Sequence, residues 1–187
     1  MWYTLKTKVI KWFGDITIYP YPMFIMFGHS GYKMKGKDIR ELIETLVPGD
    51  IVLRRYDHYI SGLLIPGYWT HSSIYIGDNK IIHMLGEGIT KEDILTFSRC
   101  DDMCIIRKNN NEFPRPEDAV AAAIRLYESN ISYDFEFSDN PDKLYCSEFT
   151  HICYGKPRSS RIKKKGLILP DDQFNYIDFH LEWRKSS

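Results

Sequence analysis

Two strand-like runs joined by a tight turn constrain the fold of this chain more than any other feature. Residues 71–76 and 80–85 are rich in β-branched and aromatic residues, and Gly77-Asp78-Asn79 lies between them. Such runs on either side of a turn rich in glycine and asparagine predict a β-hairpin. The chain therefore needs an antiparallel sheet, and the hairpin carries two histidines, His71 and His83.

The length of the turn decides whether the two histidines share a face of the sheet. A two-residue turn would put them on opposite faces, because side chains alternate along a strand. A three-residue turn pairs Ile76 with Lys80 and Ser73 with His83, which places His83 diagonally across from His71 at roughly 7–8 Å between backbones. Since glycine and asparagine suit the left-handed conformation of such a loop, we predict the three-residue form.

Helices and further strands are expected on both sides of the hairpin. Apolar residues at helical spacing predict a helix over 37–46, and a proline followed by two acidic residues predicts another over 116–129. The mixture predicts a single α+β domain built on an antiparallel sheet. The other expected elements are a turn at 48–50, strands at 51–53 and 103–108, a brief helix at 59–64 and a helix at 145–154. On the helix over 116–129, the expected buried face holds Val120, Ala123, Ile124 and Tyr127.

The composition excludes several classes of protein. The 187 residues carry 25 basic and 25 acidic side chains, so the chain lacks the positive field of a general nucleic-acid binder and we expect no nucleic-acid partner. Its four cysteines, at 100, 104, 146 and 153, lack the paired spacing of a zinc site, which favours free thiols in a reducing compartment. We expect neither a metal nor a cofactor.

Residues 1–36 are expected to form an N-terminal extension before a domain over 37–187. Their apolar stretch over 16–27 is too short for a membrane span and is broken by two prolines, and no cleavage site follows it. A cytoplasmic location is therefore the default expectation. The aromatic residues of this stretch leave a membrane-surface contact open, although packing of the extension is favoured. They are Tyr19, Tyr21, Phe24 and Phe27.

Cys146 is the candidate nucleophile, because it lies in the first turn expected of a helix. The free backbone N–H groups and the dipole there favour a thiolate and can hold an oxyanion. His71 is the candidate general base and His83 the candidate orienting residue, since a histidine base needs a second polar group to fix its ring. The alternatives are a buried small apolar Cys146, a polar His71 at a strand end and a core His83 with a local hydrogen bond.

Four short motifs together resemble the circularly permuted papain-like superfamily. They are Pro48-Gly49-Asp50-Ile51-Val52, Trp69-Thr70-His71-Ser72-Ser73-Ile74-Tyr75-Ile76-Gly77, Ile82-His83 and Tyr145-Cys146-Ser147-Glu148-Phe149. Within it the chain resembles the YiiX/YebB-like cysteine hydrolases, relatives of the NlpC/P60 peptidases, and it shares the order His, His, Cys with lecithin retinol acyltransferase-like proteins. The resemblance covers about residues 46–155.

The resemblance implies a permuted papain-like fold in which the nucleophile, Cys146, begins a helix. It also implies that His71 is the base and His83 the orienting residue on the next strand, with Glu87 as the alternative because YiiX-type members often have glutamate there. The implied activity is hydrolysis of an amide bond in a peptide or peptidoglycan-type substrate, without a cofactor. The alternatives are lipid acyl transfer or thioester hydrolysis, and a non-catalytic binding module. The oligomeric state is not predicted.

Overall fold

The computed structural model describes most of the chain from Tyr32 onward and two short strands before it. The described residues are 16–20, 23–27, 32–57, 59, 65–109, 112–138, 140, 142–155, 167–176 and 178–186. The brief helix expected over 59–64 lies outside them except for Tyr59, as do Tyr21 and the side chains of the other N-terminal aromatic residues. No described helix is long and apolar enough to cross a membrane.

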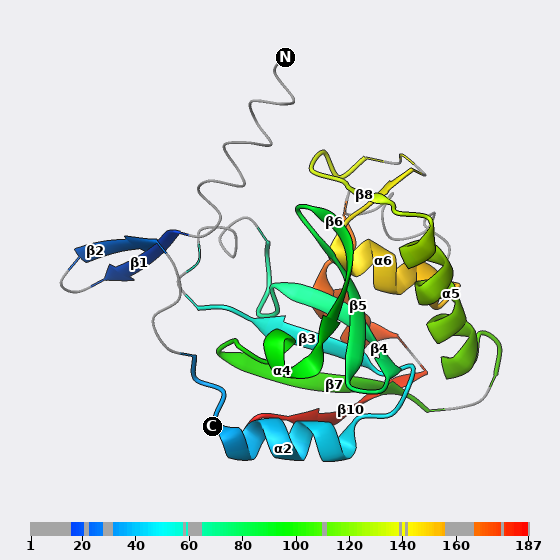
Figure 1. Cartoon of the computed structure of the whole chain (residues 1–187), viewed down its shortest axis with the longest axis horizontal. Helices are drawn as coiled ribbons and strands as arrows, with labels where there is room; N and C mark the ends of the chain where they lie inside the picture. The colour runs from blue at the N-terminus through cyan, green and yellow to red at the C-terminus, as the bar shows by residue number, and fades with distance from the viewer. Residues whose placement is uncertain are drawn as a thin grey trace.

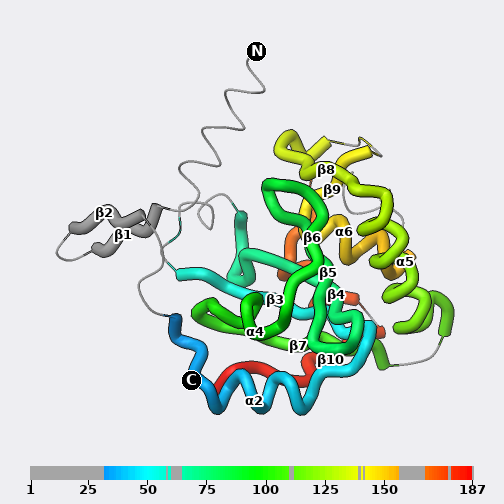
Figure 2. Tube along the Cα trace, in the orientation of Figure 1, coloured from blue at the N-terminus to red at the C-terminus, as the bar shows by residue number. Residues whose placement is uncertain are grey.

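A six-stranded antiparallel sheet forms the centre of the fold (Figure 1). Its strand order is β10-β7-β3-β4-β5-β6, and Figure 2 shows the C-terminal strand β10 returning to lie beside β7 and α2. The expected α+β architecture is therefore confirmed. The strands are β3 (Ile51–Arg55), β4 (His71–Gly77), β5 (Lys80–Leu85), β6 (Gly88–Asp93), β7 (Asp102–Lys108) and β10 (Phe179–Arg184).

Helices cover both faces of the sheet. On one face, α5 (Pro116–Glu128) and α6 (Cys146–Cys153) pack against inward side chains such as Ile51 and Ile74. On the other, α2 (Gly36–Thr45) and the short α4 (Ile94–Phe97) pack against the alternate side chains of the same strands. The remaining elements are the antiparallel ribbon β1 (Ile16–Pro20) and β2 (Met23–Phe27), the parallel pair β8 (Ser132–Tyr133) and β9 (Lys143–Leu144), and the 3-10 helix η1 (Pro170–Asn175).

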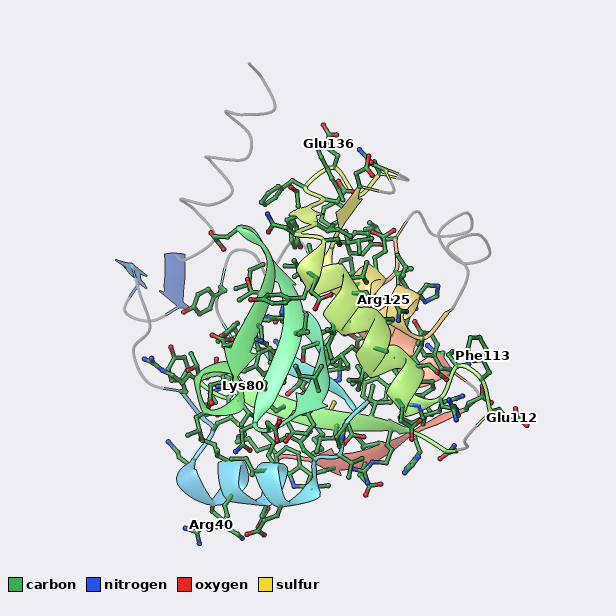
Figure 3. All side chains as sticks on the ribbon, turned by 45° about the vertical axis from the view of Figure 1, so that its right-hand side comes forward. Arg40, Lys80, Glu112, Phe113, Arg125 and Glu136 are labelled. Atoms are coloured by element: carbon green, nitrogen blue, oxygen red, sulfur yellow. The ribbon has the colours of Figure 1, made fainter. Side chains whose placement is uncertain are left out.

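The sequence predicts the buried face of α2 correctly and that of α5 only in part. On α2, Leu42 is fully buried while Arg40 extends from the outer side (Figure 3), as the helical spacing predicts. On α5, the expected buried face is wrong at Ile124 and Tyr127, which are exposed. The buried positions are alanines, with partly buried Leu126 beside them, because small side chains let the helix approach the sheet and α6 closely.

The β4–β5 hairpin has the predicted pairing of Ser73 with His83 but a different turn. Gly77 pairs with Lys80, so the turn has two residues, Asp78 and Asn79, which both have positive φ (50° and 56°). The three-residue form is therefore wrong. A register shift between Tyr75 and Gly77 supplies the extra residue instead, as a β-bulge does, and it keeps His83 on the face of Ser73.

The Pro48-Gly49-Asp50 turn links β3 to the hairpin and to α6. Gly49 has a φ of 97°, and a Cβ there would lie 2.5 Å from Cβ of Pro116, so the position requires glycine. The hydroxyl of Tyr154, just after α6, donates to the carbonyl of Gly49. Asp50 is buried and accepts two hydrogen bonds of 2.8 Å from Arg107 of β7. This motif therefore has a structural role: it fixes α6 relative to the sheet.

Candidate active site

Cys146 is the first residue of α6 and so lies in the first turn of a helix, as the sequence predicts, although the helix begins one residue later than expected. The preceding Tyr145 is extended and provides no side-chain cap, so the N–H groups of the first turn remain available to a ligand. The backbone N–H groups of Ser72 and Ser147 are placed to donate to the sulfur once it is a thiolate. Burial raises the pKa of the Cys146 thiol more than these bonds lower it. The resting sulfur is therefore protonated and needs a base.

A buried polar cluster holds β4 against α6 next to this thiol. The Ser72 hydroxyl lies 2.9 Å from the Thr150 hydroxyl, one helical turn after Cys146. The side-chain amide of Gln173, from η1, donates to both hydroxyls, at 2.9 Å and 2.6 Å. Three elements far apart in the sequence are thus joined at one point, which gives the start of α6 a rigid support.

The two histidines of the hairpin are hydrogen-bonded to each other. His71 Nε2 lies 2.8 Å from His83 Nδ1, and the rings meet edge to face with centroids 5.1 Å apart. His83 is completely buried. Burial lowers the pKa of both imidazoles, and the positive charge of Arg54 lowers each further. Both rings are therefore neutral at neutral pH, the state in which an imidazole accepts a proton.

Two charged residues that the sequence does not indicate complete this cluster. Arg54, on β3, is buried with its guanidinium 4.1 Å from the centre of the Phe97 ring. Glu92, on β6, places Oε2 at 3.9 Å from Arg54 and at 3.4 Å from His83 Nε2. Burial raises the pKa of Glu92 against the opposing charge of Arg54. The strand that carries Glu92 is missing from the predicted elements, so Glu92 is not among the predicted site residues.

Glu87, the alternative orienting residue, lies in the two-residue turn between β5 and β6. The ring nitrogen that meets His71 belongs to His83, on the regular strand before this turn. Among these two candidates, the geometry therefore favours His83.

Cys146 and His71 approach β4 from its two sides. The His71 ring lies on the α4 side, 6.0 Å from the centre of Phe97, whereas Cys146 belongs to the core on the α6 side. The thiol contacts the backbone N–H of Ser72, the residue directly after His71. Within the described residues, no hydrogen bond joins the thiol to the imidazole, because the two side chains lie on opposite faces of β4. A direct proton transfer between them requires the His71 side chain to turn toward the α6 side of the strand.

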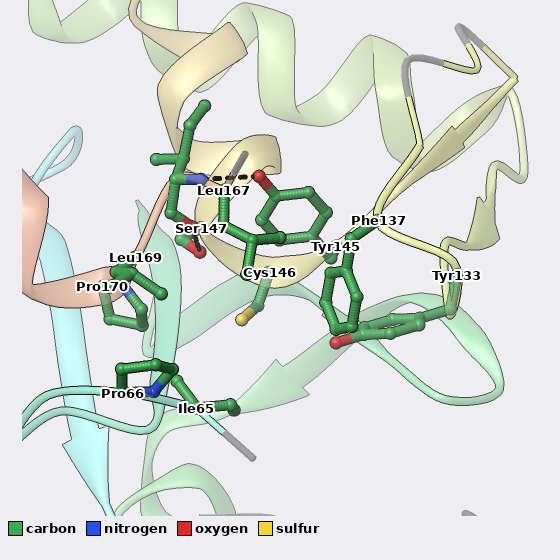
Figure 4. Close-up of a pocket in the computed structure, with 11 residues that line it drawn as sticks. Ile65, Pro66, Tyr133, Phe137, Tyr145, Cys146, Ser147, Leu167, Leu169 and Pro170 are labelled. Atoms are coloured by element: carbon green, nitrogen blue, oxygen red, sulfur yellow. Dashed lines mark hydrogen bonds between the residues drawn. The ribbon is translucent and has the colours of Figure 1, made fainter. Parts of the chain in front are cut away.

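A pocket opens beside the thiol (Figure 4), where the sulfur of Cys146 points toward the open space. About 320 Å³ beside the thiol is free of atoms, and this includes space that is open to solvent. Apolar and aromatic side chains from separate segments form its walls. The lining residues are Ile65, Pro66, Tyr133, Phe137, Tyr145, Cys146, Ser147, Leu167, Ile168, Leu169 and Pro170.

All four cysteines are free thiols. The three outside the pocket are buried, as Cys146 is, and burial raises their pKa, that of Cys100 to about 12. No group of three or more potential ligands that could hold a metal ion occurs among the described residues.

Comparison with known proteins identifies one family. A family model described as a permuted papain-like amidase enzyme, YaeF/YiiX, C92 family, matches residues 45–176. The match runs from the end of α2 through η1, so it includes β3–β7, α6 and the pocket. No curated protein matches the chain.

Proposed function

Because the chain belongs to the YaeF/YiiX (C92) family of permuted papain-like amidases, we propose that it hydrolyses an amide bond with Cys146 as nucleophile, His71 as general base and His83 as the residue that orients His71. One observation carries the assignment. The only pocket-lining thiol among the described cysteines begins a helix, and its sulfur contacts the residue next to a hydrogen-bonded pair of neutral histidines.

The position of Glu92 supports one assignment of protons to the ring nitrogens of His83 and His71. A carboxylate 3.4 Å from His83 Nε2 favours a proton on that nitrogen. Nδ1 of His83 then accepts the proton of His71 Nε2 across the 2.8 Å contact, which leaves Nδ1 of His71 unprotonated. Nδ1 of His71 is the nitrogen that takes the thiol proton. Glu92 and His83 act through His71 and are positioning residues.

The reaction then proceeds in two halves. His71 accepts the thiol proton while the sulfur attacks the carbonyl carbon, and N–H groups at the start of α6 stabilise the oxyanion. The C–N bond breaks as the imidazolium returns its proton to the leaving amine, which leaves a thioester on Cys146. His71 next takes a proton from water, hydroxide attacks the thioester, and the thiol is restored as the carboxylic acid leaves.

An amide in a peptide or a peptidoglycan fragment is the first candidate substrate, since the family is one of amidases. Acyl transfer or thioester hydrolysis on a lipid is the second candidate. It is favoured by an imidazole, rather than a carboxylate, next to His71.

Hydrolysis of aminocoumarin amides tests the proposal. The protein should release the coumarin, and Cys146→Ala and His71→Ala should each abolish release, whereas Cys153→Ala, a change on the same helix outside the pocket, should retain it. A thioester on Cys146 that builds up with phospholipid and not with amides would support the lipid activity instead. Release that survives Cys146→Ala contradicts the proposal, and a folded protein that neither reacts nor forms a thioester is a binding module.

A further inference from the structure

The pocket beside Cys146 is built so that its walls present apolar groups. The backbone N–H of Ile168 donates to the Tyr145 hydroxyl at 2.8 Å, and the Ser147 hydroxyl donates to the carbonyl of Ile168 at 2.7 Å. These contacts satisfy the polar groups of Tyr145, Ser147 and Ile168 that take part in them within the protein. Among the lining residues drawn in Figure 4, none carries a charged side chain.

Phe137 forms the side of the pocket in an unusual conformation. Its backbone φ is 52°, a left-handed value that bulky residues rarely adopt. The fully buried Asp134 enforces the loop by accepting hydrogen bonds from the N–H groups of Glu136, at 2.9 Å, and Ser138, at 2.7 Å. The Phe137 ring meets Tyr145 edge to face at 5.2 Å. The loop therefore holds an exposed aromatic ring at the pocket, whereas Glu136 points outward (Figure 3).

The size of the pocket limits what it can hold. About 320 Å³ is free of atoms, but this includes space open to solvent, and the part enclosed by the walls has room for only about two water molecules. One aromatic or branched aliphatic group can enter from the open side, whereas a long fatty chain cannot be enclosed. A charged group would lose its hydration without gaining an opposite charge from the lining residues.

We propose that this pocket selects the acyl side of the substrate, and that it accepts a single short, uncharged, branched or aromatic group attached to the scissile carbonyl. The inference rests on the proposed function, because it takes Cys146 as the atom that attacks this carbonyl. A group on the carbonyl carbon stays attached to the sulfur in the thioester and is therefore held next to the pocket walls.

Chloromethyl ketones test the pocket without requiring hydrolysis, because the thiol displaces chloride from the reagent. The series carries phenylethyl, 2-methylpropyl, methyl, 4-ammoniobutyl and pentadecyl groups on one reactive ketone. Rates of Cys146 labelling are measured by mass spectrometry and divided by the rates with free glutathione. Phenylethyl and 2-methylpropyl should label Cys146 roughly 10- to 100-fold faster than methyl, as burial of one such group provides. The ammonio and pentadecyl reagents should label Cys146 no faster than the methyl reagent does.

Phe137→Ala should reduce the ratio of phenylethyl to methyl labelling about 10-fold. Phe113→Ala removes an equally large exposed ring outside the pocket and should leave the ratio unchanged. Equal corrected rates across the series, or fastest labelling by the ammonio or pentadecyl reagent, would overturn the inference even if amides are hydrolysed. A clear preference without amide hydrolysis would support the pocket and contradict the proposed reaction.

Discussion

Replacing Glu92 by glutamine should slow the labelling of Cys146 by iodoacetamide. Glu92 does not contact the thiol and acts on it through His83 and His71. Glutamine keeps the shape of the side chain and removes its charge. Its amide N–H can donate to His83 Nε2, the nitrogen that lies 3.4 Å from the present carboxylate. The proton of His83 then moves to Nδ1 and is donated to His71 Nε2, so that His71 holds its own proton on Nδ1. That nitrogen can accept the thiol proton only after the protons shift back, which adds to the barrier.

The size of the effect follows from the distances. The positive charge that develops on His71 lies one imidazole beyond His83, whose ring centroid is 5.1 Å away, so it is roughly 8 Å from Glu92. With an effective dielectric constant of 20 to 40, the lost attraction is about 1–2 kcal/mol. Since Glu92 is 23% exposed, the larger dielectric constant applies to part of its surroundings. We expect labelling of Cys146 by iodoacetamide to be about 5- to 30-fold slower.

Labelling rates at pH 7, measured by mass spectrometry for each cysteine, provide the assay. Glu87→Gln is the matched control, because it makes the same change in the nearby turn and should alter the rate less than about twofold. Urea unfolding of each variant establishes that the fold is retained. An unchanged rate in Glu92→Gln, or an equal loss in Glu87→Gln, would refute the proton arrangement.

Three further predictions concern stability and are measured by urea unfolding. Arg107→Met leaves the Asp50 carboxylate buried without its charged partner and should cost about 3–5 kcal/mol, and a loss under 1 kcal/mol would contradict this. Gly49→Ala should cost about 1–3 kcal/mol from its φ of 97° alone, and full stability would contradict a required glycine. Because the pKa values of His71 and His83 are lowered by folding, the unfolded chain binds protons first below pH 6.5. As the pH is lowered from 6.5 to 5, the free energy of unfolding should therefore fall by up to about 1.4 kcal/mol per pH unit for each histidine. A constant free energy of unfolding over this range would contradict the lowered pKa values.

Local patterns in the sequence predict much of the fold. The expected helix over 145–154 corresponds to α6 and places Cys146 at its first residue. The pairing of Ser73 with His83 is correct although the three-residue turn from which it is predicted is wrong. It holds because a bulge between Tyr75 and Gly77 supplies the extra residue, and local turn chemistry does not predict that bulge.

The missing parts of the site depend on contacts between distant segments. In the sequence, Arg54 is a polar residue at the end of a predicted strand, which indicates a position exposed to solvent. Only the fold shows that its guanidinium is buried against Phe97. Glu92 belongs to a strand whose sequence, Gly88–Asp93, is mostly polar and has no strong β pattern. The pocket walls come from separate parts of the chain, so their apolar character cannot be read from any single motif.

The pH dependence of Cys146 labelling tests most directly whether His71 is the base for this thiol. With the pKa of His71 well below its usual range and that of the thiol raised, labelling in the unchanged protein should be nearly constant between pH 6.5 and 8.5. In His71→Ala the rate at pH 7 should fall at least about 100-fold and then rise about tenfold per pH unit as free thiolate forms. The same flat profile in both proteins would contradict the pairing of Cys146 with His71.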